Sequence, residues 1–136
     1  MKPQNPTKLY PLIITDKLEE TKRFYAERAG FRVVHDRPMY LQVAYGEGDG
    51  PELAFMRSDA FPDGQRQPTF EGKGVVVSIP TPDADAKYDA LAKAKVPLLS
   101  KPEDRPWGWR SFVAVDPNGL QLDFFHVYKE LEASEA

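Results

Sequence analysis

One order of predicted elements occurs twice in this chain, and that repeat restricts the fold more than any other feature of the sequence. The first copy is a strand, an amphipathic helix and three strands, at residues 9–15, 17–29, 31–36, 39–46 and 51–57. Alternating apolar residues indicate the strands, and apolar residues at helical spacing indicate the helix. The second copy begins roughly 65 residues later, judged from the matching stripes of the two helices. The chain is therefore predicted to be α+β, with two tandem βαβββ units.

The second copy follows the same order with its own punctuation. A strand at 73–79 precedes a helix whose apolar stripe includes Tyr88 and Leu91. Three strands then follow, at residues 96–101, 109–115 and 119–126. The sequence Asp-Pro-Asn-Gly at 116–119 is a strong turn signal between the last two strands.

Both helices carry signals for where they begin and end. Asp16, with Glu19 three residues later, is typical of an N-cap and its capping-box partner. Gly30 stands where a C-terminal glycine cap belongs. Thr81 is predicted as the N-cap of the second helix, with Pro82 in its first turn.

The length and the linker composition indicate one domain built from two halves. A chain of 136 residues suits a single domain over 1–136, with halves at about 8–57 and 73–127. Residues 58–72 have turn composition and no periodicity, so they are predicted to be a linker between the halves. The acidic end at 128–136 is predicted to be a frayed helix or a disordered tail.

Charge and composition exclude several kinds of partner and site. The chain has no cysteine, which rules out disulfides and thiolate metal sites. Its 18 Lys+Arg against 21 Asp+Glu give a net charge of -3, which argues against nucleic-acid binding. No apolar run is long enough to span a membrane or to form a signal peptide. We therefore expect a cytoplasmic protein with no membrane and no nucleic-acid partner.

Two segments resemble the vicinal oxygen chelate superfamily, which includes glyoxalase I, bleomycin-resistance proteins, fosfomycin-resistance enzymes and extradiol dioxygenases. These segments are LEETKRFYAERAGFRVV at 18–34 and WGWRSFVAVDPNGLQLDFFH at 107–126. The Phe-Tyr pair ahead of Gly-Phe and the DPNG turn ahead of an alternating strand are typical of this family. The resemblance implies that the sheets curl into a cup, with the helices outside and a cavity within. It also implies a homodimer in which the partner completes each cup.

The same resemblance supplies a test for a metal centre. Metal-using members place one ligand on each of four cavity-facing strands, and those positions fall here on Tyr10, Glu52, Gly74 and Asp123. Glycine has no donor atom, and a protonated tyrosine is a poor ligand at neutral pH. Two carboxylates alone make at best a weak site for a hard cation. We therefore predict no metal and no cofactor.

Strand alternation selects the residues that face the cavity. In the last strand Gln121, Asp123 and Phe125 form a mixed face opposite an apolar one. Trp107 and Trp109, two positions apart on a predicted strand, point the same way and offer a sandwich for a flat ligand. The predicted ligand-binding residues are Tyr10, Glu52, Met56, Trp107, Trp109, Arg110, Gln121, Asp123 and Phe125.

Structural roles for these residues stay open at this point. The two tryptophans also suit a rim that packs on a partner subunit or on the neighbouring loop. One of the carboxylates of Glu52 and Asp123 also suits an ion pair with Arg110, with both merely lining the cavity. His126 is predicted to be a core or rim histidine that is satisfied by a hydrogen bond.

Three functions follow as alternatives, and whether the protein is an enzyme stays open among them. The first is metal-independent binding of a small planar or amphipathic molecule, as in sequestration of an antibiotic. The second is a glyoxalase-like lyase or isomerase that uses Glu52 or Asp123 as its base, with or without a weakly bound divalent metal. The third is an accessory domain with a vestigial cavity.

Overall fold

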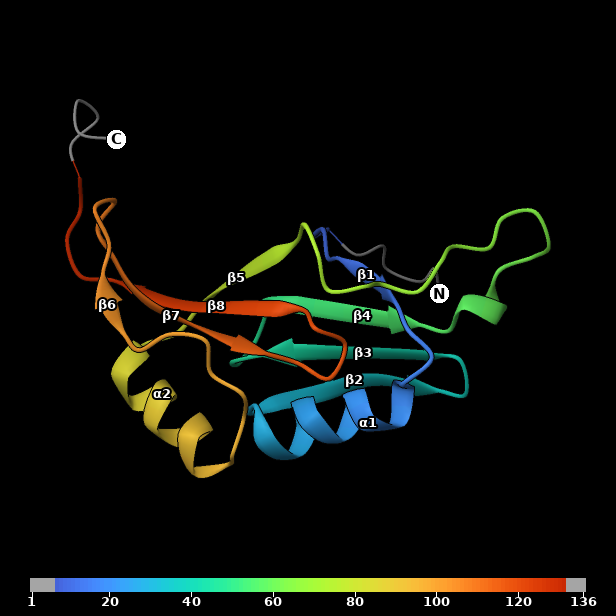
Figure 1. Ribbon diagram of the computed structural model, residues 1–136, viewed down its shortest axis with the longest axis horizontal. Helices are drawn as coiled ribbons and strands as arrows, with labels where there is room; N and C mark the ends of the chain where they lie inside the picture. Colours follow the sequence, from blue (N-terminus) through green and yellow to red (C-terminus); the bar gives the residue numbers. More distant parts are fainter. Residues whose placement is uncertain (1–6, 132–136) are drawn as a thin grey trace, which may run out of the picture.

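The computed structural model describes residues 7–131, which form two four-stranded mixed sheets and two main helices (Figure 1). The first sheet has the order β1-β4-β3-β2, and its strands are β1 (Leu12–Ile14), β2 (Phe31–Arg37), β3 (Tyr40–Tyr45) and β4 (Glu52–Met56). Strand β1 pairs with β4 in parallel, and the remaining neighbours are antiparallel.

The second sheet repeats this topology. Its order is β5-β8-β7-β6, and its strands are β5 (Val76–Pro80), β6 (Glu103–Asp104), β7 (Trp109–Val115) and β8 (Gln121–Val127). Strand β5 is parallel to β8, and the other pairs are antiparallel. The predicted α+β class with two βαβββ units is therefore confirmed.

Each sheet is accompanied by the helix of its own unit. Helix α1 (Leu18–Arg23) continues as a π-helical turn, η1 (Phe24–Arg28), before Gly30 ends it at a φ of +80°. Helix α2 (Ala84–Lys93) follows β5, and a short 3₁₀ turn, η2 (Ser58–Ala60), begins the linker. Both main helices lie on the lower side of the molecule in Figure 1.

Both predicted N-caps are wrong by one or two residues. Helix α1 has Lys17 at its N-cap without a side-chain cap, and Asp16 instead accepts a hydrogen bond from Ser58 Oγ at 3.1 Å. Helix α2 begins after Asp83, whose side chain accepts from the backbone N–H of Ala86 at 3.1 Å. Thr81 is instead buried with its hydroxyl 2.8 Å from that of Tyr45.

Several strand boundaries also differ from prediction. Segment 96–101 forms only an isolated bridge at Leu98, and the strand beside β7 is β6. Gly74 has a φ of +81° and lies before β5. Residues 128–131, the described part of the predicted tail, are not helical. Residues 132–136 of that tail lie outside the described residues.

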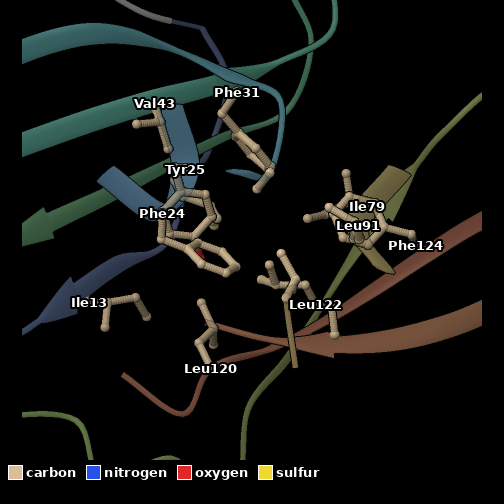
Figure 2. Packing of buried hydrophobic residues seen from close by; sticks show 14 of the residues in the cluster. Ile13, Phe24, Tyr25, Phe31, Val43, Ile79, Leu91, Leu120, Leu122 and Phe124 are labelled. Carbon is tan, nitrogen blue, oxygen red and sulfur yellow. The ribbon is translucent and has the colours of Figure 1, made fainter. Parts of the chain in front are cut away.

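The helix-facing sides of the two sheets meet in a single hydrophobic cluster. Figure 2 shows the rings of Phe24 and Tyr25 packed among residues from both halves, namely Ile13, Phe31, Val43, Leu120 and Leu122. Because one side of each sheet is buried in this core, only the opposite sides are left to bind a ligand.

Candidate functional site

The side of the second sheet away from the core carries the residues predicted for the cavity. Strand β8 alternates between buried and half-buried residues, so Gln121, Asp123 and Phe125 share the side that the core does not use. Strand register places Val76 beside Gln121 and Ser78 beside Asp123. We call this surface the open face of the second sheet.

Aromatic rings dominate one end of that open face. Trp109 of β7 and Phe125 of β8 stack with their ring centroids 3.6 Å apart and their planes 10° apart. Trp107 lies in the turn before β7, and its centroid is 6.5 Å from that of Trp109 at an angle of 70°. The two tryptophans are therefore nearly perpendicular and do not form the parallel sandwich that strand spacing predicted.

A guanidinium that sequence patterns did not single out, that of Arg105, lies on the same face as this aromatic pair. Arg105 Nε donates to Ser111 Oγ at 3.0 Å, and Arg105 Nη2 donates to the backbone oxygen of Ser111 at 3.3 Å. Ser111 is opposite Phe125 in the β7–β8 pairing and is only 2% exposed. The signal for Arg105 was hidden because the strand before β7 was predicted at the wrong residues.

Arg110 was predicted to bind ligand, but it projects to the other side of β7. Its guanidinium forms ion pairs with Asp85 at 2.7 Å and with Asp104 at 3.1 Å. The hydrogen bonds that Arg110 donates to Asp85, and secondly to Asp104, raise the pKa of Arg110. Arg110 thus fastens helix α2 to β6 and does not join the open face.

Asp123 and Glu52 each have partners other than Arg110. Ser78 Oγ donates to Asp123 Oδ2 at 3.2 Å. Lys8 Nζ lies 2.7 Å from Glu52 Oε2, and the side-chain amide of Gln42 donates to Glu52 Oε1. The hydrogen bond from Lys8 is the main reason that the pKa of Glu52 is lowered. Glu52 is therefore held as a carboxylate at neutral pH.

The corresponding side of the first sheet continues this polar network. Tyr40 OH donates to Gln42 Oε1 at 2.6 Å. Burial, and secondly the neighbouring Tyr10 hydroxyl, raise the pKa of Tyr40 to about 12. Met56 lies opposite Tyr40 in the β3–β4 pairing. Hydrogen bonds or charge thus connect four side chains, those of Tyr10, Tyr40, Gln42 and Glu52. Met56 lies next to them.

A pocket of about 410 Å³ lies where the beginning of β4 approaches β5. Its lining combines apolar residues with a few polar ones, namely Lys8, Leu9, Pro11, Phe31, Asp49, Gly50, Pro51, Glu52, Leu53, Val77, Ser78 and Ile79. The pocket therefore brings Glu52 of the first sheet towards Ser78, the hydrogen-bond partner of Asp123. Its volume is within the usual range for small-molecule sites.

The donor groups of the described residues do not form a metal site. Within residues 7–131, no three His, Asp or Glu side chains come together as metal coordination would require. His126 Nδ1 accepts the backbone N–H of Ala84 at 2.8 Å, which ties that ring to the start of helix α2. With Gly74 outside β5, the open-face residues of that strand are Val76, Ser78 and Pro80. Metal-free binding stays a prediction.

Comparison with protein families identifies a match along most of the chain. Residues 9–124 match the model of the glyoxalase/bleomycin resistance protein/dioxygenase superfamily. Among curated proteins, none matches the chain significantly. The described part of the chain, residues 7–131, contains no helix of the length and apolar character needed to cross a membrane.

Solved structures show the same fold. A glyoxalase/bleomycin resistance protein/dioxygenase from Nocardioides is similar with a TM-score of 0.71 and 22% identity, over 97% of this chain and 90% of that one. A glyoxalase/bleomycin resistance protein from a Streptomyces species has a TM-score of 0.65 and 28% identity, over 85% and 96%. A superfamily member from Sphaerobacter thermophilus has a TM-score of 0.68 and 27% identity, over 89% and 98%.

Proposed function

The chain belongs to the glyoxalase/bleomycin resistance protein/dioxygenase superfamily, and on that premise we propose that it binds a small planar or amphipathic molecule without a metal. The observation that carries the proposal is the stacked Trp109–Phe125 pair on the open face of the second sheet. Neither ring belongs to the hydrophobic core, and both remain partly accessible. Two large aromatic rings held on the side of a sheet that the core does not use suit a flat ligand.

Affinity would come from aromatic burial and from a few polar groups that fix the orientation. Burial of apolar surface is worth about 25 cal/mol per Å², and a well-placed aromatic pair adds ~0.5–1.5 kcal/mol. Trp107 is 53% exposed and its ring lies outside the stacked pair, so we expect it to contribute little to affinity. Asp123 and Gln121 supply hydrogen-bonding groups on the same face. Sequestration of the ligand needs no further chemistry.

We also propose that the protein acts as a homodimer whose second copy encloses the ligand. In a single chain the open face of the second sheet is an uncovered surface and not a cavity. Val76 at its β5 edge is 54% exposed. A two-fold pairing would cover such apolar residues and turn each open face into a cavity. In this assembly the polar network around Glu52 would also contact the enclosed ligand.

Catalysis by Glu52 is less favoured by its surroundings. A base or acid works best when its pKa lies near the working pH, whereas Lys8 holds the pKa of Glu52 below its ordinary value. A lyase or isomerase, and an accessory domain with a vestigial cavity, remain the alternatives. Turnover in a screen of glyoxalase-type substrates would support the lyase or isomerase, and failure to bind any ligand would support the accessory domain.

The decisive experiment uses the two tryptophans as reporters, since the chain has no others. We expect a planar antibiotic from a test panel to quench or shift their fluorescence. Trp109→Ala should weaken this binding roughly 5- to 150-fold, because it removes one ring of the stacked pair. Trp107→Ala is the matched control, because its ring lies outside the stack, and it should change affinity by less than about threefold.

The mass of each variant in solution separates ligand binding from subunit contact. If Trp109→Ala lowers dimer stability and leaves ligand affinity unchanged, the pair serves the interface and the proposed function fails. If no planar compound binds the parent protein, the proposed function fails as well.

A further inference from the structure

We propose that the ligand carries an anionic oxygen group, such as a carboxylate, and that Arg105 binds that group at the edge of the Trp109–Phe125 pair. This inference rests on the proposed function and specifies the chemical class of its ligand. It is carried by the placement of Arg105, by its free hydrogen-bonding capacity and by the rigidity of its backbone.

Strand register places Arg105 on the open face. Glu103 pairs with Ser111, and Asp104 pairs with Arg110, whose side chain projects to the opposite side. Arg105 continues this ladder, because its backbone N–H donates to the Trp109 oxygen at 2.6 Å. Alternation therefore puts the Arg105 side chain on the same side as Trp109 and Ser111. The bond to Ser111 Oγ confirms that position.

The guanidinium retains donors suited to an oxyanion. Of its five N–H groups, Nε and one on Nη2 are used by Ser111, and one on Nη1 faces Glu103 Oε2 at 3.3 Å. One N–H on each terminal nitrogen has no partner among residues 7–131. Because Ser111 occupies the Nε side, the end formed by the two terminal nitrogens is the side on which a carboxylate would bind with both oxygens, in the paired geometry that arginine favours.

Glu103 is a weak competitor for this group. Its side chain is 65% exposed, whereas that of Arg105 is 24% exposed. Exposed ion pairs contribute little to stability, because both charges remain well solvated. A ligand that stacks on the aromatic pair and also presents an anion would therefore share or replace the Glu103 contact.

The backbone around Arg105 is held in place. Its carbonyl oxygen accepts from Gly108 N at 3.0 Å and from Tyr128 OH at 3.1 Å. Gly108 has a φ of +89°, and a Cβ atom there would lie 2.1 Å from the backbone oxygen of Lys129. Only glycine fits this close approach. The turn before β7 therefore presents Arg105 and Trp109 in a fixed relation, which limits the entropy lost on binding.

Asp123 indicates which way round the ligand binds. It lies two residues before Phe125 on the same face, with Ser78 as its hydrogen-bond donor. An anion there would meet another carboxylate, whereas an anion at Arg105 meets a cation. The ligand is therefore expected to place its anionic end at Arg105 and an uncharged or hydrogen-bond-donating end towards Asp123.

The test compares two probes with the same ring system, 2-naphthoate and uncharged 2-naphthamide, by calorimetric titration of the full chain. We expect naphthoate to bind more tightly, and its affinity to fall as the salt concentration rises. Arg105→Gln should weaken naphthoate binding at least tenfold and naphthamide binding less than about twofold. Arg66→Gln is the control, because it removes the same charge from the exposed linker.

A second variant tests the inference by a gain of affinity, which a folding defect would not produce. Glu103→Gln frees the Nη1 side of Arg105, so naphthoate affinity should rise about two- to fivefold. Equal binding of the two probes, or equal losses for both in Arg105→Gln, would overturn the role of Arg105 and leave the proposed function intact. If neither probe nor any planar compound binds, both proposals fail.

Discussion

The ammonium group of Lys87 lies in surroundings that are unusual for a charged side chain. It lies on α2 with Nζ 4.8 Å from the Tyr45 ring centroid and 5.3 Å from that of Phe124, and it donates to the Ala29 oxygen. Within residues 7–131 it makes no ion pair with a carboxylate. Burial lowers the pKa of Lys87 to about 8. The folded protein thus holds this ammonium less readily than the unfolded chain does.

The pH dependence of stability follows from that shift. Between pH of about 8 and the ordinary value of 10.5, the unfolded chain keeps a proton on Lys87 that the folded protein has released. The free energy of unfolding should therefore rise with pH across this window by a contribution that Lys87→Met lacks. Urea unfolding of both proteins at pH 7, 9 and 10.5 measures it. Parallel pH profiles for the two proteins would contradict the assignment.

A buried hydrogen bond between Tyr25 and Asp116 connects the two halves. Tyr25 OH donates to Asp116 Oδ2 at 2.8 Å, and the other Asp116 oxygen accepts from Asn118 N and Leu120 N. Tyr25→Phe leaves Asp116 Oδ2 with only the longer hydrogen bond from Asn118 Nδ2 at 3.3 Å, so we expect a loss of about 1–3 kcal/mol in unfolding free energy. Tyr88→Phe, which keeps the ring contact with Phe112, should cost less than about 0.5 kcal/mol in the same urea titration.

At the scale of elements, local sequence signals predicted the wrong first residue for both helices. The local sequence predicts the start of the second helix at Thr81-Pro82, whereas Asp83 caps it in the structure. The Thr81 hydroxyl instead lies 2.8 Å from that of Tyr45 in the other half. Only tertiary structure decides between them. The capping-box pattern at Asp16 and Glu19 fails in the same way, because Asp16 bonds with Ser58 in the linker.

A pair of substitutions tests these helix beginnings. Asp83→Ala removes the side chain that caps α2, so it should cost about 0.5–2 kcal/mol of stability. Glu19→Ala removes a residue that caps nothing in the structure, and it should cost less than about 0.5 kcal/mol. Thermal unfolding of both variants provides the comparison. A larger loss for Glu19→Ala than for Asp83→Ala would contradict the observed cap.

Strand alternation is a more reliable guide than helix caps, because one buried side fixes every second residue. The alternation in β8 alone is enough to put Asp123 and Phe125 on the side that the core does not use. It fails for Trp107, because the turn at Gly108 separates this residue from β7. It cannot reveal Arg105, because β6 has only two residues and its register with β7 is a long-range property.

At the scale of the whole molecule, each half depends on the other for its core and leaves its second face open. The element order predicted two similar units, and two such units with one apolar side each bury those sides best together. The arrangement of the open faces in an assembly lies beyond sequence patterns. It depends on which sheet edges stay accessible after the halves have packed.

The two sheets differ in how well their outer edges are protected. Strand β2 carries charged residues such as Arg32 and Arg37, and an irregularity between Val33 and His35 interrupts its pairing with β3. Charges and bulges discourage the addition of further strands at an edge. Strand β5 has neither charges nor a bulge. It ends in Pro80, but its first residue, Val76, is an exposed apolar side chain. Self-association is therefore expected at the β5 side.

A homodimer built in this way should have twice the 15.4 kDa chain mass in sedimentation or light scattering at micromolar concentration. Val76→Glu would place a carboxylate in the covered surface. The dissociation constant of the dimer, measured from its concentration dependence, should therefore rise at least tenfold. Val34→Glu, at the already charged β2 edge, should leave the dimer unchanged. A parent protein with the mass of one chain, or equal dissociation of the two variants, would contradict assembly through β5. Because an enclosed site needs the second copy, Val76→Glu should also weaken ligand binding in proportion to the dimer lost.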